Sequence, residues 1–277
     1  MRSATLQIGS RRYSMDTLDF KFEVNFCDSD ELGTAAIEVT NLSENTRNGI
    51  KKNDQIIINA GYEGDIGCIF VGQLSEAAHN QGVVDWVTKI KATASLDEWL
   101  GRQVNKTYNK GIDAQSVLND LLNLFGMEIG KMQLVENPTY PRGKVCKGRL
   151  KDVLTEIVTS DCKSRFLIKH GQVIISDPNQ SEGQEILLSP ETGLLRCSED
   201  KVAVQADKPQ NTKDGQQEKS DKENLVKLPS LLRYEIGPGA AVTVKSKAHN
   251  GRFLIKKGQH VGSRTGKWET MMEGMPL

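Results

Sequence analysis

The stretch LDFKFEVNF, residues 18–26, decides the fold class, because its apolar residues alternate strictly with polar ones. Alternation with a period of two is typical of a β-strand that buries one face. Four further stretches have strand character: 37–39, 56–58, 68–74 and 83–91. They are separated by bends at 41–45 and 61–65 and by a polar connection at 75–82. Several short strands without a helical period favour a small barrel or sandwich for the first hundred residues.

The pattern changes to a helical period after residue 112. Apolar residues between Ala114 and Phe125 fall on one face of a helix, with Asp113 as N-cap and Gly126 just past the end. A second amphipathic helix and a hairpin turned at His170 and Gly171 follow: 150–158, 165–168 and 172–176. The stretch from about 95 to 180 is therefore predicted to be a small α+β unit.

Strands resume in the last third of the chain, at 186–188, 241–247, 252–260 and 268–272. Between Asp207 and Asn224 no residue is a large apolar one, so this stretch cannot offset its ordering entropy by burial. We predict a polar flexible or late-ordering insertion at about 205–226. The chain is thus expected to be a β-rich α+β protein with three parts: 1–96, 97–180 and 181–277.

Composition narrows the class of protein. The 277 residues include 36 basic and 36 acidic ones, and a net charge of zero argues against a general nucleic-acid binder. The five cysteines are widely spaced without a C-x-x-C pair, which favours reduced thiols over zinc or disulfides. The N-terminus lacks the apolar core of a secretory signal, and no apolar run reaches the ~20 residues of a membrane span. The sequence predicts a soluble, cytoplasmic chain.

No catalytic, cofactor or metal site is predicted. Residues 262–267 place three residues between their glycines where a phosphate-binding loop has four, and Trp268 replaces its Ser or Thr. The four histidines are dispersed; His249 and His260 could approach across a hairpin, but further ligands are lacking. The remaining candidates are interpreted as surface carboxylates (97–98, 182 and 185), core tryptophans (86, 99 and 268) and solvated basic edges (11–12 and 51–52).

Four segments together resemble one family, the baseplate hub proteins of contractile phage tails and related injection machines (the late control D or tail hub family). Residues 35–74, with their Asn-Leu-Ser bend and Gly-Tyr turn, resemble the family's first barrel, and 84–100 the strand that leaves it. Residues 148–176 are similar to its helix-plus-hairpin unit. Residues 231–274, with an Asn-Gly hairpin and a final Trp-x-Thr strand, resemble the closing barrel.

The resemblance implies two tail-tube-like β-barrels with the α+β unit between them. A homotrimer would then present six barrels in a ring and join a sixfold tail tube protein to a threefold tail spike protein. Tape measure and baseplate wedge proteins are further candidate partners, and DNA would pass through the channel without sequence recognition. The implied location is the virion tail baseplate, assembled in the bacterial host cytoplasm.

Three other functions stay open. A distal tail or tube-capping protein would use the same barrel with sixfold symmetry. A secretion-system spike adaptor differs from a hub in its biology more than in its physics. A tail-associated cell-wall hydrolase would need a carboxylate pair, a metal or a thiol centre, and the sequence indicates none, so the chain is expected not to be an enzyme.

Overall fold

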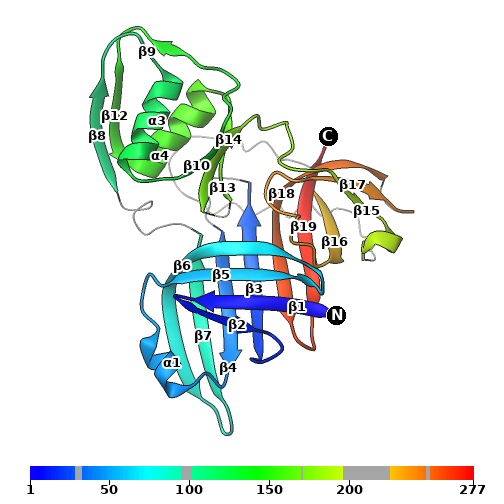
Figure 1. The fold of residues 1–277 in the computed structure, drawn as a ribbon. Helices are drawn as coiled ribbons and strands as arrows, with labels where there is room; N and C mark the ends of the chain where they lie inside the picture. Colours follow the sequence, from blue (N-terminus) through cyan, green and yellow to red (C-terminus); the bar gives the residue numbers. More distant parts are fainter. Residues whose placement is uncertain (29–32, 95–101, 170, 196–224, 248–249) are drawn as a thin grey trace, which may run out of the picture.

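A computed structural model describes residues 1–28, 33–94, 102–169, 171–195, 225–247 and 250–277. Strands dominate it, and Figure 1 shows two β-rich parts with a compact α+β unit beside them. No helix within the described ranges is long and apolar enough to cross a membrane. The β-rich α+β class expected from the sequence is therefore observed.

The first β module consists of the N-terminal strands. They are β1 (Arg2–Ile8), β2 (Arg11–Ser14), β3 (Phe20–Cys27), β4 (Thr34–Thr40), β5 (Gln55–Tyr62), β6 (Asp65–Gln81) and β7 (Trp86–Thr93). The alternation in β3 works as predicted, because Phe20, Phe22 and Val24 are buried while Lys21 and Glu23 face solvent. Neighbouring strands bury the same inner face, which produces one apolar core.

Three details of this module differ from the sequence prediction. Strands β1 and β2 were not predicted, although β1 buries Ala4, Leu6 and Ile8 at alternate positions. The polar stretch 75–82 is mostly strand, since β6 continues to Gln81 and pairs with β7 up to its tip. Its residues are polar because this half of the hairpin stands in solvent. A short helix, α1 (Glu44–Gly49), follows the bend at 41–45, and its N-cap Ser43 accepts a hydrogen bond from the amide of Thr46. A helix of six residues, fewer than two turns, is too short to give a periodic signal.

The α+β unit contains two helical segments covered by short strands. Its elements are β8 (Gln103–Tyr108), β9 (Ile112–Asp113), α3 (Ala114–Leu124), β10 (Ile129–Met132), β11 (Thr139–Tyr140), β12 (Lys144–Arg149), α4 (Leu150–Thr155), the π-helix η1 (Glu156–Asp161), β13 (Arg165–Lys169) and β14 (Gln172–Ser176). Asp113 caps α3 as predicted, since its Oδ1 accepts from the amide of Ser116 at 2.9 Å. The apolar faces of α3, α4 and η1 form a separate core. The continuation of α4 as a π-helix has no counterpart in the sequence prediction.

The second β module contains three strands of its own and two that it shares. Its elements are β15 (Ile186–Leu188), the 3-10 helix η2 (Pro190–Thr192), β16 (Val226–Leu231), β17 (Ala241–Lys245), β18 (Asn250–Ser263) and β19 (Trp268–Pro276). The start of β18 pairs with β17, whereas residues 257–263 pair with β3 of the first module. A bulge between Ile255 and Lys257 in the β18–β19 ladder separates the two halves. One twelve-stranded sheet, counted over the described residues, therefore runs through both modules.

The shared strands also connect the cores. Trp268 of β19 and Leu232 belong to the core of the first module, where the Trp268 ring meets Phe22 edge to face at 5.8 Å between centroids. The predicted division at 96/97 and 180/181 remains a prediction, and so does the closure of each β module into a barrel. The insertion predicted at about 205–226 lies mostly outside the described residues.

Candidate functional site

The junction of the two β modules with the α+β unit is the part of the molecule where buried polar groups gather. The end of β3, the hairpin β13–β14, the stretch 232–240 and the middle of β18 meet there. A small cavity of about 50 Å³ is lined by residues of all three parts. Because these segments are far apart in sequence, the contacts between them set how the three parts are oriented.

A buried ion network crosses this junction. Arg165 of β13 donates from Nη1 to Oδ2 of Asp28, just after β3, at 3.1 Å. The same carboxylate lies 3.5 Å from Nζ of Lys256 in β18, and Arg165 lies 3.6 Å from Glu182, which also pairs with Lys131. The side chains of Asp28 and Arg165 are only 1% and 7% exposed, so these charges interact with little solvent screening.

The two carboxylates of the network respond differently to burial. Burial raises the pKa of Asp28, and the nearby positive charges of Arg165 and Lys256 offset this only in part. Burial also acts on Glu182, but hydrogen bonds from Ser176 and Lys131 outweigh it and leave the pKa lowered. Glu182 is thus held ionised beside Arg165, while Asp28 bears the larger desolvation cost.

A second contact holds the first β module against the stretch that leads into β17. The Tyr234 ring packs on Gly67 of β6, where a side chain of any other residue would overlap it. Its hydroxyl donates to Oδ1 of Asp65 at 2.9 Å. Gly67 is therefore required by a close approach of two segments and not by a turn.

A buried histidine lies between the modules, on the shared strand β18. His260 is 2% exposed, its register partners are Val24 and Thr270, and its ring lies 4.9 Å from that of Phe26. The Thr270 hydroxyl is 2.8 Å from Nδ1 and also accepts from the amide of Arg233. Burial lowers the pKa of His260 to about 4, so the ring is neutral at pH 7.

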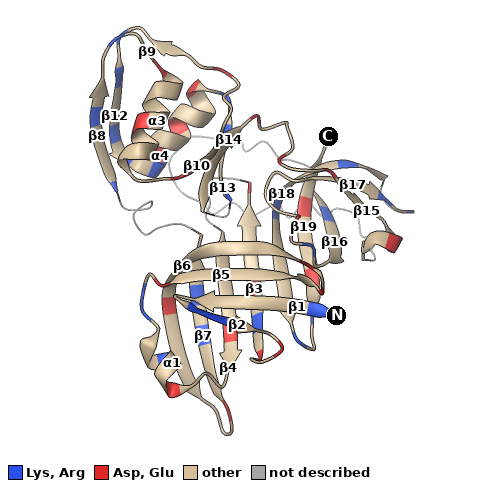
Figure 2. Cartoon of the chain, viewed as in Figure 1, with Lys and Arg blue, Asp and Glu red and all other residues tan. Residues whose placement is uncertain are grey.

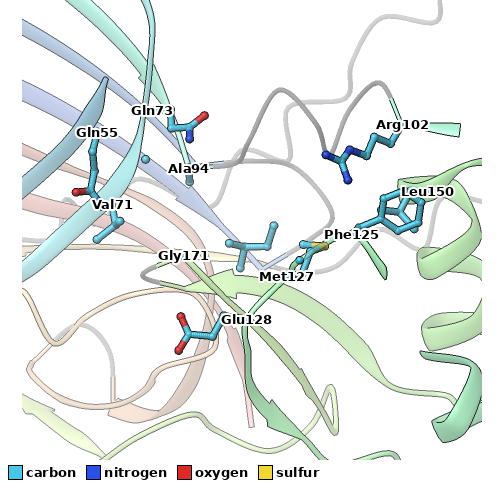
Figure 3. Close-up of a pocket in the computed structure, with 13 residues that line it drawn as sticks. Gln55, Val71, Gln73, Ala94, Arg102, Phe125, Met127, Glu128, Leu150 and Gly171 are labelled. Carbon is cyan, nitrogen blue, oxygen red and sulfur yellow. The ribbon is translucent and has the colours of Figure 1, made fainter. Parts of the chain in front are cut away.

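A larger hollow of about 310 Å³ lies between β5 and β6 on one side and the α+β unit on the other (Figure 3). Its apolar lining comes from Val71, Phe125, Met127, Leu150 and Ile168. Arg102 stands over the Phe125 ring at 5.5 Å, and Glu128 and two glutamines complete the polar rim. Among the described residues that line the hollow, no nucleophile is paired with a base.

The residues considered from sequence are placed as follows. The prediction that Glu182 is a surface carboxylate is wrong, because the chain after β14 folds back over β13 and buries this side chain in the ion network. Glu185 is exposed, as predicted. Residues 264–267 connect β18 to β19, and the Trp268 ring is buried as predicted. Trp86 is half-buried under the Arg47 guanidinium at 4.1 Å. The pair 97–98, Trp99, His170 and His249 lie outside the described residues.

Sequence reasoning missed Asp28 and Arg165 as members of a site, and it considered His260 only as a possible metal-binding partner of His249. Asp28 and Arg165 are 137 positions apart, and no local pattern links two such residues. His260 stands between Gln259 and Val261 in β18, with glycines at 258 and 262, so no alternation of apolar residues marks its side chain as buried. Across the described ranges, no group of three or more His, Cys, Asp or Glu side chains is arranged to hold a metal ion.

Comparison with known proteins gives matches in structure alone. No family model and no curated protein sequence matches the chain. A tail protein from Neisseria meningitidis MC58 superposes with a TM-score of 0.67 at 9% identity, covering 99% of this chain and 96% of that one. The 43 kDa tail protein of prophage MuSo2 from Shewanella oneidensis gives 0.68 at 10% identity, covering 100% and 98%.

A third match comes from a secretion machine. An Escherichia coli protein, described as a component of the type VI secretion system with structural similarity to the T4 bacteriophage tail proteins gp27 and gp5, has a TM-score of 0.63 at 11% identity. The alignment covers 98% of this chain and 76% of that one. Identities this low establish a shared fold, and the chain therefore has the fold of phage tail proteins and of a type VI secretion component over nearly its whole length.

Proposed function

We propose that this chain is a structural subunit of a phage-tail-type injection machine. Specifically, it would be the baseplate hub whose three copies join a sixfold tail tube to a threefold spike. The observation that carries the proposal is the match over nearly the full length of two tail proteins, so that both β modules and the α+β unit are included. A match to one module alone would fit many β proteins.

The arrangement of the β modules supports the symmetry argument. If each module closes as a tube-like barrel, one chain presents two and a trimer presents six around one axis. The modules share β18 and β19, so their relative orientation is set within each chain and a ring of alternating modules can be regular. The tube and spike proteins are the proposed partners, and DNA would pass through the ring without being read.

The mass of the purified protein across a concentration series, by native mass spectrometry or light scattering, tests this proposal. A trimer of three 30.6 kDa chains is the expected result. A hexamer would contradict the hub and favour a distal tail or tube-capping role with the same fold. A monomer at every concentration would contradict a ring that closes without its tube or spike partner.

A further inference from the structure

One small part of this neutral chain carries a local surplus of positive charge. Residues 102–112 and 138–151 contain eight Lys and Arg residues and no Asp or Glu, although the whole chain has 36 of each sign. These two segments contain β8 and β12, which pair antiparallel over their whole length as a two-stranded ribbon. Figure 2 shows blue residues along both strands, which lie at one edge of the α+β unit.

The ribbon has an inner face on which charge is balanced. Lys106 reaches Asp120 of α3 at 2.5 Å, and Lys144 reaches Asp161 of η1 at 2.9 Å. Tyr108 donates to the same Asp120 oxygen at 2.6 Å. These contacts attach the ribbon to the helices and fix which face points outward, because side chains alternate between the two faces of a strand.

The outer face carries cations without acidic neighbours on the ribbon. Lys147 and Arg149 of β12 lie opposite Asn105 and Gln103 of β8 and are exposed. Arg149 makes one weak contact, at 3.5 Å, with the exposed Asp152. Lys110 and Arg142 lie at the far end of the ribbon, and neither they nor Lys147 form an ion pair within the described part of the chain. Each of the two cations on β12 therefore lies beside a side chain of β8 that can donate a hydrogen bond.

The chemistry of this face selects its ligand. Cations interleaved with Asn and Gln donors are the groups that contact phosphate oxygens. Within the described ribbon, the outer face exposes one large apolar side chain, Val145, and Tyr108 is buried, so the face offers too little apolar and aromatic surface for a protein interface or a base-stacking platform. A two-stranded ribbon also has the width that a DNA groove admits.

We propose that the outer face of the β8–β12 ribbon binds the sugar-phosphate backbone of double-stranded DNA without reading its bases. The neutral charge of the whole chain does not oppose this, because screening limits electrostatic attraction to about 10 Å and the ligand senses the local charge. This inference goes beyond the structural role proposed above and does not depend on the oligomeric state.

Fluorescence anisotropy of a labelled DNA duplex of about 20 base pairs, titrated with the full chain at about 50 and 200 mM salt, tests the inference. The ribbon variant carries Lys147→Gln and Arg149→Gln. The matched control carries Arg264→Gln and Lys267→Gln, which removes the same charge from the exposed turn between β18 and β19.

We expect the wild type and the control to bind equally and the ribbon variant to bind at least about tenfold more weakly at low salt. The magnitude of its negative slope of log K against log salt should decrease by about 1.8, since each of the two lost phosphate contacts contributes about 0.9. If the first variant folds poorly, a second ribbon variant, Lys110→Gln with Arg142→Gln, replaces it in the test. This variant should also bind DNA more weakly than the wild type.

Three results would overturn the inference: no binding by the wild type at low salt, an equal loss in the control, or displacement of the duplex by polyglutamate at matched charge. The last result would indicate an acidic protein surface as the partner. The mass of the protein in solution is measured separately, so failure of this inference is distinguishable from failure of the hub proposal.

Discussion

Acidification should destabilise the protein through one buried side chain, His260. The ring lies on β18 between the two β modules, with the Thr270 hydroxyl at Nδ1 and a hydrogen bond to the Ile236 backbone. Since the Thr270 oxygen already accepts from the amide of Arg233, its own proton is free to point at Nδ1. The neutral ring with its proton on Nε2 satisfies both hydrogen-bond partners, whereas a charged ring would be buried with no acidic partner among the described residues.

The magnitude follows from the two pKa values. His260 has a pKa of about 4 in the folded protein, against about 6.5 for an unperturbed histidine. The unfolded chain therefore binds more protons than the folded one between these values, and stability falls as the pH drops from about 6.5 toward 4. Between pH 7 and pH 5 this single group should remove about 2 kcal/mol of unfolding free energy.

The assay is urea unfolding at pH 7 and at pH 5, followed by tryptophan fluorescence, for the wild type and for His260→Gln. Glutamine does not titrate, so the variant should lose about 2 kcal/mol less than the wild type over this interval, whatever its stability at pH 7. His79→Gln is the matched control, because His79 also lies on a strand and contacts a threonine hydroxyl, at 3.1 Å from Thr88. If the wild type and His260→Gln lose the same free energy on acidification, His260 is not the titrating group and the reasoning is wrong.

Two further predictions concern the junction. Arg165→Met should lower the unfolding free energy, measured in urea titrations, by about 3–5 kcal/mol, because it leaves the buried Asp28 carboxylate without its main counter-charge. A loss below about 1 kcal/mol would contradict the importance of the ion network. Gly67→Ala should cost about 1–3 kcal/mol by overpacking the Tyr234 ring, and the double variant with Tyr234→Ala should not show this extra cost; equal costs in both backgrounds would refute the close approach.

Local patterns identified several of the elements whose burial repeats along the chain, although β1, which buries Ala4, Leu6 and Ile8 at alternate positions, was missed. The alternation of Phe20, Phe22 and Val24 identified β3, and the face from Ala114 to Phe125 identified α3 with its cap at Asp113. In each case a run of several apolar residues reports one buried face. The resemblance to tail proteins rests on segments that form such strands and helices, and it agrees with the matches in fold.

Elements with few apolar residues were missed. The ribbon strand β8 buries only Val104 and Tyr108, and its third inward position is Lys106, whose charge is met by Asp120. The outer half of β6 buries almost nothing, so its sequence reads as a polar connection. Sequence periodicity detects burial and not hydrogen bonding, and strands held mainly by their ladders therefore escape it.

The junction was beyond sequence reasoning for another reason. Asp28, Arg165 and Lys256 come from three parts of the chain. They meet where β18 passes from the second β module into the first. The first half of β18 belongs to the second β module and the second half to the first, so a rotation of one module against the other would break a continuous ladder as well as the ion network. Breaking a buried pair leaves an uncompensated charge, which resists motion more strongly than apolar contact alone. We therefore expect little bending between the two modules, which is a property that the proposed place between a tail tube and a spike would need.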